Sequence, residues 1–397
     1  MNISNNDVKI LLGDLIGIHS PYFEEQRIMD YVYEWLTRQG IPAQFHHYHE
    51  KKITNFKGVN VIGEIQGTSG PSILINSHLD TVHICEGWTT DPLKAEVIGN
   101  KMYGLGALDM KSGAAAAMLA LKAFKENVKS FNGKVVYNFV SDEEGPYGLG
   151  TNAILEDGLL ENISVAIVPE PSSGFTSESF PCLCLGARGG YSYTVEVSGS
   201  SAHAANPDQG ICAIEAASKI MLALKSLNLT YDEHLGKGDI CIVDFNGGGA
   251  ACSVADKASF KVFRHIVNGE DKETLRTEVN TAVKLADVDV PYTVEFRDSP
   301  SEGSDGFMPY KVSYDNEYTQ KMVQSIERVT ELHPNISYFQ SIGDFNYIGS
   351  RLKIPTFVFG PGGSNYHSAD EFVYLNDVVE TARVIYDYLV TVLEASE

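Results

Sequence analysis

Histidine and carboxylate side chains follow five short segments of the sequence that are predicted to be strands or Gly-rich loops. The residues are His78, Asp80, Asp109, Glu143, Glu144, Glu170 and His367. Strands fix the positions of ligands, and the loops that follow them leave room for an open coordination site. Imidazole nitrogen and carboxylate oxygen together suit zinc, and cobalt or manganese can occupy the same donors. The pattern therefore predicts a metal centre with mixed nitrogen and oxygen ligands.

The local spacing indicates different tasks for these residues. His78 and Asp80 are two residues apart at a predicted strand end, so they point to the same side and the carboxylate can orient the imidazole. Asp109 stands where a nucleotide-binding G-x-G-x-x-G loop needs its third glycine, and a carboxylate there would repel pyrophosphate. It is better suited to bridging two cations. Of the adjacent Glu143 and Glu144, one can bind metal and the other can act as a base, although a solvated acidic turn is the alternative.

The elements around these residues predict an α/β fold. Helical and extended patterns alternate over the first 180 residues, which indicates a central, mostly parallel sheet flanked by helices. From Arg188 the strands alternate apolar and polar residues in a β-α-β-β-α-β order, which predicts a small insert with a one-sided antiparallel sheet. We therefore expect a discontinuous catalytic domain at 1–185 and 299–397, interrupted by an inserted domain at 186–298, with 299–306 as a Gly/Ser/Pro-rich linker.

The composition excludes several classes of function. The chain has 397 residues with 30 Lys and Arg against 52 Asp and Glu, a net charge of −22 that disfavours nucleic acid and anionic lipid as partners. No stretch approaches the roughly 20 apolar residues that span a bilayer, and no leader is recognisable at the start. The six scattered cysteines are not a disulfide framework. We expect a cytoplasmic protein with reduced thiols and no membrane partner.

Taken together, the motifs resemble a known family, the co-catalytic di-zinc amidohydrolases and peptidases. Its members include acetylornithine deacetylase, succinyl-diaminopimelate desuccinylase, aminoacylase and glutamate carboxypeptidase. The matching strings are SHLDTV (77–82), GLGALDMKSG (104–113), SDEEG (141–145), PEP (169–171), RGGYSYTVEVSGSSAHAANPDQG (188–210) and GPGGSNYHSADE (360–371). They follow the family order over nearly the whole chain, and they specify the family far better than the substrate. The resemblance implies a zinc-peptidase-like catalytic domain, a ferredoxin-like dimerisation domain and therefore a homodimer.

The same resemblance implies two divalent metal ions per chain, zinc by preference. Asp109 would bridge both ions. His78 and Glu170 would complete one site, and Glu144 and His367 would complete the other. Glu143 would be the general base that takes a proton from water and later protonates the departing amine.

Further roles follow from the family pattern and from the loops. Asp80 is implied to orient His78, and His203 in SSAHAANP is implied to stabilise the oxyanion in the partner's active site. Arg264 matches an arginine that binds the substrate carboxylate.

Two observations bear on substrate recognition. Exposed amides of the loop at Gly360 and Gly362 are expected to bind an anionic substrate group. The chain departs from the family where an Asn and a Pro three residues later are usual, because Cys252 and Ala255 stand there. This change puts one substrate contact in doubt and is consistent with an unusual substrate.

These features favour an enzyme that hydrolyses the amide bond of an N-acyl amino acid, of the acetylornithine or succinyl-diaminopimelate kind, since a Glu at position 170 is typical of acylases and carboxypeptidases. A metallo-carboxypeptidase or dipeptidase acting on short peptides is the alternative. A non-catalytic binding module would lack a ligand or the base, and none is missing. A serine hydrolase is disfavoured because no G-x-S-x-G occurs. The run HHYH at 46–49 is interpreted as an exposed strand, not a third metal site.

Overall fold

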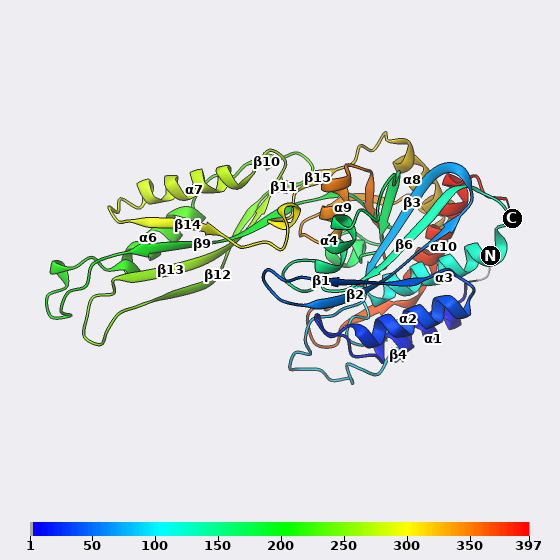
Figure 1. The fold of residues 1–397 in the computed structure, drawn as a ribbon, viewed down its shortest axis with the longest axis horizontal. Helices are drawn as coiled ribbons and strands as arrows, with labels where there is room; N and C mark the ends of the chain where they lie inside the picture. The colour runs from blue at the N-terminus through cyan, green and yellow to red at the C-terminus, as the bar shows by residue number, and fades with distance from the viewer. Residues whose placement is uncertain (1–2, 397) are drawn as a thin grey trace. The chain divides into compact units, whose positions relative to one another are not determined.

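The computed structural model describes residues 3–396, and the chain forms two compact units. The first combines the residues up to Ala187 with those from Tyr310 onward, and the second is Arg188–Pro309, coloured green to yellow in Figure 1. The run 299–306, expected to be a linker, belongs to the second unit. The reason is local pairing, because Gly190 and Phe307 exchange two backbone hydrogen bonds of 2.7 and 2.9 Å.

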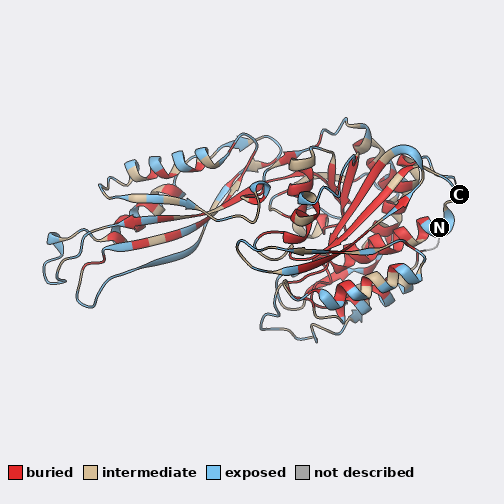
Figure 2. Ribbon diagram, viewed as in Figure 1, coloured by how far each residue is buried: buried red, intermediate tan, exposed pale blue. Residues whose placement is uncertain are grey.

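A mixed sheet of nine strands forms the centre of the first unit among the described residues. Its order is β1 (Gln44–His49), β2 (Lys57–Gln66), β6 (Asn132–Val140), β3 (Thr68–His78), β7 (Val165–Val168), β17 (Thr356–Val358), β8 (Cys182–Ala187) and β15 (Tyr310–Lys311), with β16 (Asn335–Phe339) beside β8. The central strands β6, β3, β7 and β17 are parallel. Their runs of Val, Ile and Leu are buried (Figure 2), as expected for strands covered on both faces.

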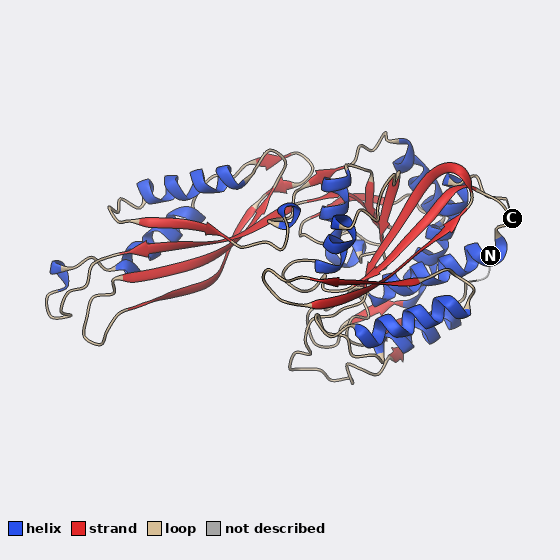
Figure 3. Ribbon diagram, in the orientation of Figure 1, coloured by secondary structure: helices blue, strands red, loops and turns tan. Residues whose placement is uncertain are grey.

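Helices pack around this sheet (Figure 3). They are α1 (Asn5–Ile16), α2 (Gln26–Arg38), α3 (Lys111–Asn127), α4 (Leu149–Glu156), α5 (Ser172–Phe175), α8 (Glu317–Thr330), α9 (Asp344–Leu352) and α10 (Leu375–Val392). α1, α3 and α10 contact one another, whereas α4 and α9 form a separate pair that contacts β2 and β7. The Ala-rich sequence of α3 lets this helix lie buried along most of its length. The first unit is therefore the expected α/β domain.

The second unit has the expected β-α-β-β-α-β order, with a short additional hairpin, β10 and β11, inserted after the first helix. Its elements are β9 (Gly189–Ser198), α6 (Ala213–Lys225), β10 (Tyr231–Asp232), β11 (Gly236–Lys237), β12 (Asp239–Gly248), β13 (Lys257–Ile266), α7 (Lys272–Leu285) and β14 (Tyr292–Phe296). The four-stranded sheet has the order β12, β13, β9, β14 and is antiparallel throughout. α6 packs on β9 and β13, whose buried positions alternate with exposed or half-buried ones.

Within residues 3–396, none of the helices combines the length and the apolar character needed to cross a membrane.

Candidate metal centre

Parallel strands deliver several candidate ligands to one edge of the large sheet. β3 ends at His78, which lies opposite Val140 at the end of β6. The turn with Glu143 and Glu144 follows Val140, and Glu170 follows the neighbouring strand β7. Because the carboxyl ends of parallel strands meet at the same edge of a sheet, the four side chains converge there.

A second sheet brings the loops of Asp109 and His367 together. Its strands are β18 (Gly363–Ser364), β19 (Phe372–Tyr374), β5 (Lys101–Tyr103) and β4 (Glu96–Ile98), in that order. β5 leads into the Gly-rich loop that holds Asp109, and β18 and β19 enclose the loop that holds His367. The buried carboxylate of Glu371 accepts hydrogen bonds from the backbone N–H groups of Gly106, Leu108 and Asp109 at 2.8, 2.8 and 2.9 Å. Glu371 thereby fixes one loop against the other.

Asp109 lies between the two imidazoles. Its Oδ1 is 3.2 Å from His78 Nε2, and its Oδ2 is 3.4 Å from His367 Nε2. Glu170 Oε1 lies 3.4 Å from His78 Nε2, and Glu144 Oε1 lies 3.0 Å from His367 Nε2. Each oxygen of Asp109 thus faces a different histidine and carboxylate pair, and this arrangement gives two adjacent groups of donor atoms.

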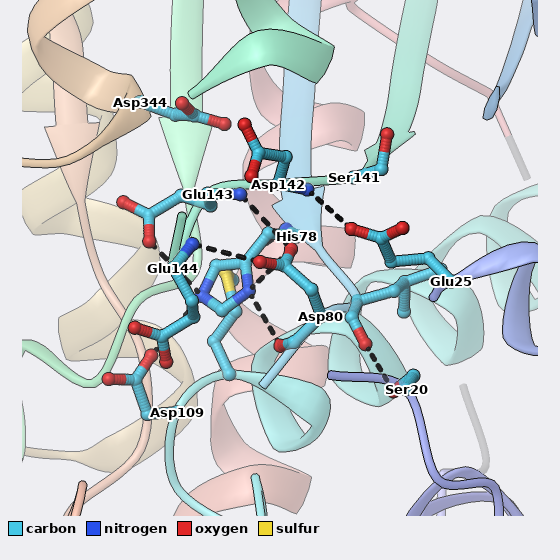
Figure 4. A network of polar contacts seen from close by, with 12 residues as sticks. Ser20, Glu25, His78, Asp80, Asp109, Ser141, Asp142, Glu143, Glu144 and Asp344 are labelled. Atoms are coloured by element: carbon cyan, nitrogen blue, oxygen red, sulfur yellow. Dashed lines mark hydrogen bonds and ion pairs between the residues drawn. The ribbon is translucent and has the colours of Figure 1, made fainter. Parts of the chain in front are cut away.

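Asp80 holds both His78 and the acidic turn in place (Figure 4). His78 Nδ1 lies 3.1 Å from the backbone oxygen of Asp80 and 3.5 Å from its Oδ1, so Nε2 points toward the carboxylates. The two carboxylate oxygens of Asp80 accept the N–H groups of Glu143 at 3.1 Å and Glu144 at 2.8 Å. One buried carboxylate therefore orients the imidazole and the turn together.

The electrostatics of the cluster favour positive charge. Burial raises the pKa of Glu144 and of Glu170 to about 7, and it raises the pKa of Glu143 well above its ordinary value. Hydrogen bonds to Asp109 and Glu144 raise the pKa of His367 to about 11. The donor groups His78, Asp109 and Glu144, and His78, Glu143 and Glu170, each have ligand atoms within 4.8 Å of one another. Imidazole and carboxylate donors crowded in this way fit two divalent cations, which would offset the buried negative charge.

A pocket of about 90 Å³ opens onto the cluster. Its lining consists of Asp109, Glu143, Glu144, Glu170, His367, Phe175, Phe339, Ser341, Ile342 and Phe345. Candidate ligands and the base form one side, and mostly apolar residues from α5, β16, the segment leading into α9 and α9 itself form the other. A small substrate that enters this pocket would contact both.

Several buried carboxyl groups near the centre were not identified from the sequence. Asp344 Oδ2 accepts the hydroxyl of Thr151 at 2.6 Å, and burial raises its pKa to about 7. Glu25 Oε1 accepts the N–H of Asp142 at 3.0 Å, and burial raises the pKa of Glu25 to about 8. Asp142 stands inside the SDEEG motif, but nothing in the local pattern around Asp344 or Glu25 points to the site.

His46 lies on a strand, as expected, but it is buried and not exposed. Its Nε2 is 2.8 Å from Asp157 Oδ2, and its Nδ1 is 3.1 Å from Asn60 Nδ2. The Asn60 Oδ1 accepts hydrogen bonds from both the backbone N–H and the hydroxyl of Ser141 at 3.1 Å. Ser141 begins the turn that carries Glu143. The hydrogen bonds from His46 through Asn60 to Ser141 therefore help to hold this turn in place.

Gly360 and Gly362 do not offer free amides, contrary to the expectation of anion binding. The N–H of Gly360 donates to Ser172 Oγ at 3.2 Å, and the N–H of Gly362 donates to Asp377 Oδ2 at 3.1 Å. Both glycines are buried. A Cβ on Gly360 would lie 2.3 Å from the backbone oxygen of Glu170, so this glycine allows close packing behind a candidate ligand.

Arg264 is fully buried in the second unit, and carboxylates already occupy its guanidinium group. Its Nη2 lies 2.7 Å from Glu270 Oε1 and 2.8 Å from Glu278 Oε1, and its Nη1 donates to the backbone oxygen of His265. This pairing argues against the expected contact with a substrate carboxylate and favours a structural role.

Replacing Arg264 with Met is expected to destabilise the protein by about 3–5 kcal/mol, because Glu270 would remain buried without its partner. Urea unfolding followed by circular dichroism measures the change. Arg27→Met is the matched control, since Arg27 is exposed on α2 and its loss should cost about 0.5 kcal/mol at most. Equal stability of the two variants would refute the structural role.

His203 is exposed in the second unit, where its loop pairs with the segment that departs from the family pattern. Its Nδ1 accepts the N–H of Ala205 at 3.1 Å, which leaves Nε2 as the hydrogen-bearing nitrogen of the neutral ring. Ala204 N–H donates to the backbone oxygen of Cys252 at 2.8 Å. Cys252 is exposed, and Ala255 is buried.

Gly343 separates Ile342 from Asp344 and contacts the candidate base. A Cβ at this position would lie 2.5 Å from the ring of Phe345 and 2.9 Å from Glu143 Oε1. Gly343→Ala should therefore displace one of them and lower kcat/KM by about 100-fold, the loss typical of misplacing a reacting group by about 1 Å. Gly13→Ala is the control, because its Cβ would meet only Ala95 at an ordinary 3.7 Å. Unchanged kinetics of Gly343→Ala, measured on folded protein, would contradict the placement.

Comparisons with known proteins agree with this geometry. The sequence profile of peptidase family M20/M25/M40 matches residues 74–391. A succinyl-diaminopimelate desuccinylase from Wolinella succinogenes is 28% identical over 318 residues, which cover 79% of this chain and 82% of the relative. The crystal structure of aminopeptidase PepT from Bacillus cereus has a TM-score of 0.79 at 19% identity, covering 98% of this chain and 99% of that one. A dinuclear metal-binding M20 peptidase from Bacillus subtilis has a TM-score of 0.69 at 16% identity, with 99% of both chains covered. The chain belongs to the peptidase family M20/M25/M40 and is a metallo-hydrolase.

Proposed function

We propose that this enzyme hydrolyses the amide bond of a small N-acyl amino acid, with two divalent cations and with Glu143 as general base. The observation that carries the proposal is the position of Asp109, whose two oxygens face His78 and His367 separately. The name of the desuccinylase relative and the dinuclear metal site named for the Bacillus subtilis peptidase support it. Zinc is the preferred metal, with cobalt or manganese as alternatives.

The first cation would be held by His78, Asp109 and Glu170, and the second by Asp109, Glu144 and His367. When bound, the cations supply Lewis acidity that polarises a carbonyl oxygen and makes water a better nucleophile at neutral pH.

The chain's own groups move the proton. Glu143 Oε2 lies 3.9 Å from His78 Nε2, close to the ligands but with its side chain lining the pocket. It would accept a proton from the attacking water and return it to the leaving amine. Asp80 keeps the backbone of this turn fixed through its bond to Glu143 N–H, so the base is positioned before the substrate arrives.

The second unit would form a homodimer and supply His203. The exposed ring can donate from Nε2 to the oxygen that becomes negative when the carbonyl is attacked. In a homodimer this contact would come from the partner, as the family resemblance implies. Short peptides are the second candidate substrates, because aminopeptidase PepT shares the fold and the same type of bond would be cleaved.

The test combines metal analysis with a substrate panel. Purified protein should contain two divalent ions per chain and should hydrolyse N-acetyl or N-succinyl amino acids faster than dipeptides. Faster hydrolysis of dipeptides would select the peptidase alternative. Absence of hydrolysis across the panel in protein with two metals per chain would refute the proposal.

A further inference from the structure

The wall opposite the candidate ligands is built of aromatic and aliphatic side chains. We call Phe175, Phe339, Ile342 and Phe345 the apolar wall. The ring centroid of Phe339 lies 5.0 Å from that of Phe175 and 4.9 Å from that of Phe345. Phe339 is 3% exposed and Phe345 is fully buried, so the packed rings form a fixed surface.

The apolar wall extends beside both the ligands and the base. At one end the ring of Phe175 contacts that of Tyr366 in a tilted arrangement with a centroid distance of 4.1 Å, and Tyr366 precedes the candidate ligand His367 in the chain. At the other end Phe345 and Glu143 lie on the same side of Gly343, since a Cβ built there would come within 2.5 Å of the Phe345 ring and 2.9 Å of Glu143 Oε1. A group joined to the amide that reaches Glu143 would therefore lie against the apolar wall.

The pocket offers no protein cation to a charged substrate group. Among the described residues that line it, His367 alone can carry positive charge, and four others are carboxylates. Among the described residues that line the pocket on the side of the apolar wall, Ser341 is the one polar residue. With both cations bound the carboxylates would be paired with metal, but a substrate carboxylate placed against the apolar wall would still lose water and find no Lys or Arg among the lining residues.

We propose that the substrate group which occupies this pocket is small, uncharged and apolar, a specificity different from the one in the name of the desuccinylase relatives. The inference rests on the proposed function and adds the substrate class. Each methylene placed against the apolar wall should raise kcat/KM about fourfold until the pocket of about 90 Å³ is full.

Two substrate series on the full-length enzyme loaded with zinc test this proposal. The first varies the acyl group on one amino acid: acetyl, propionyl, butyryl and succinyl. The second varies the amino acid under one acyl group: Gly, Leu, Phe, Glu and Lys. In at least one series kcat/KM should rise with apolar size and fall at least about tenfold for the charged member. If neither series shows this preference for apolar groups, the inference is overturned.

A variant of the apolar wall makes the test specific. Ile342→Arg places a cation in the pocket, and Ile342 is half-buried, so the longer side chain can be accommodated. The ratio of kcat/KM for the charged over the apolar substrate should increase at least tenfold, whereas Ile342→Val should only reduce the rate with apolar substrates. Ile10→Arg, at an exposed site on α1, should leave the ratio unchanged. An unchanged ratio in Ile342→Arg with two metals bound would overturn the inference.

The outcomes separate the two proposals. If the enzyme hydrolyses the amide bond but prefers charged substrate groups, only the proposed apolar substrate class is contradicted. Loss of all hydrolysis in the wild-type enzyme with two metals per chain contradicts the proposed function, and the substrate class with it.

Discussion

Glu143→Gln is expected to lower kcat by about 10²–10⁴-fold, the contribution typical of a positioned general base. The amide has nearly the same shape as the carboxylate but cannot accept the proton of water. KM should change little, because Glu143 is proposed to act on the proton and not to hold the substrate. Steady-state kinetics on a substrate identified by the panel measures the effect.

Measuring the metal content shows whether the lower kcat of Glu143→Gln comes from loss of the base or from loss of bound metal. The variant should retain two divalent ions per chain by mass spectrometry, because Glu143 is not one of the proposed ligands. Glu126→Gln is the matched control: Glu126 is exposed near the C-terminal end of α3, whereas the helix begins at Lys111 beside the centre. At 1.5 Å per residue this places it about 20 Å away, and its kinetics should match the wild type. A Glu143→Gln enzyme with near-normal kcat would remove Glu143 from the mechanism.

Asp109→Asn is expected to lose both cations together with all measurable activity. The Asp109 carboxylate faces both histidines, so the neutral amide would remove negative charge from both donor groups and turn an N–H toward one of them. The affinity for zinc should fall by more than about 100-fold. This is a larger loss than the one typical of changing a residue that only hydrogen-bonds to a metal ligand. Metal content by mass spectrometry and zinc titration by calorimetry measure this effect.

His367→Ala is the comparison variant that tests whether Asp109 binds both cations. His367 contacts Glu144 and one oxygen of Asp109, so its loss should empty one position and leave the other filled. Asp30→Asn, at an exposed site on α2, should leave metal content unchanged. Retention of two ions by Asp109→Asn would refute the bridging role.

Comparing the thermal stability of the metal-free and metal-loaded forms tests metal binding at the same site independently of activity. Ligands that bind only the folded state raise its free energy of unfolding by an amount that grows with the logarithm of ligand concentration once this exceeds Kd. The wild type should gain thermal stability when zinc is added, Glu143→Gln should gain as much, and Asp109→Asn should gain little. The comparison does not depend on knowing the substrate.

The sequence was sufficient to predict the α/β class, the inserted second unit and the residues that gather at the centre. It could do so because these features are local. The run Val165–Val168 has the composition of a buried strand and forms β7 with those bounds, and His78, Asp109 and Glu170 stand in short motifs beside strand ends or Gly-rich turns. The motifs did not predict α4 or α9, whose short patterns are weak.

The contacts that support the site and the lining of its pocket were not predicted from the sequence. Glu371 holds the loop of Asp109 although it lies 262 residues away in the chain, and Arg264 pairs with Glu270 and Glu278 instead of offering its guanidinium group to a substrate carboxylate. The apolar wall likewise brings Phe175 of α5 against Phe339 of β16, although the two residues are far apart in the chain. The physical reason is that periodicity and composition specify which face of an element is buried, whereas the partner of a polar or aromatic side chain is set by long-range packing.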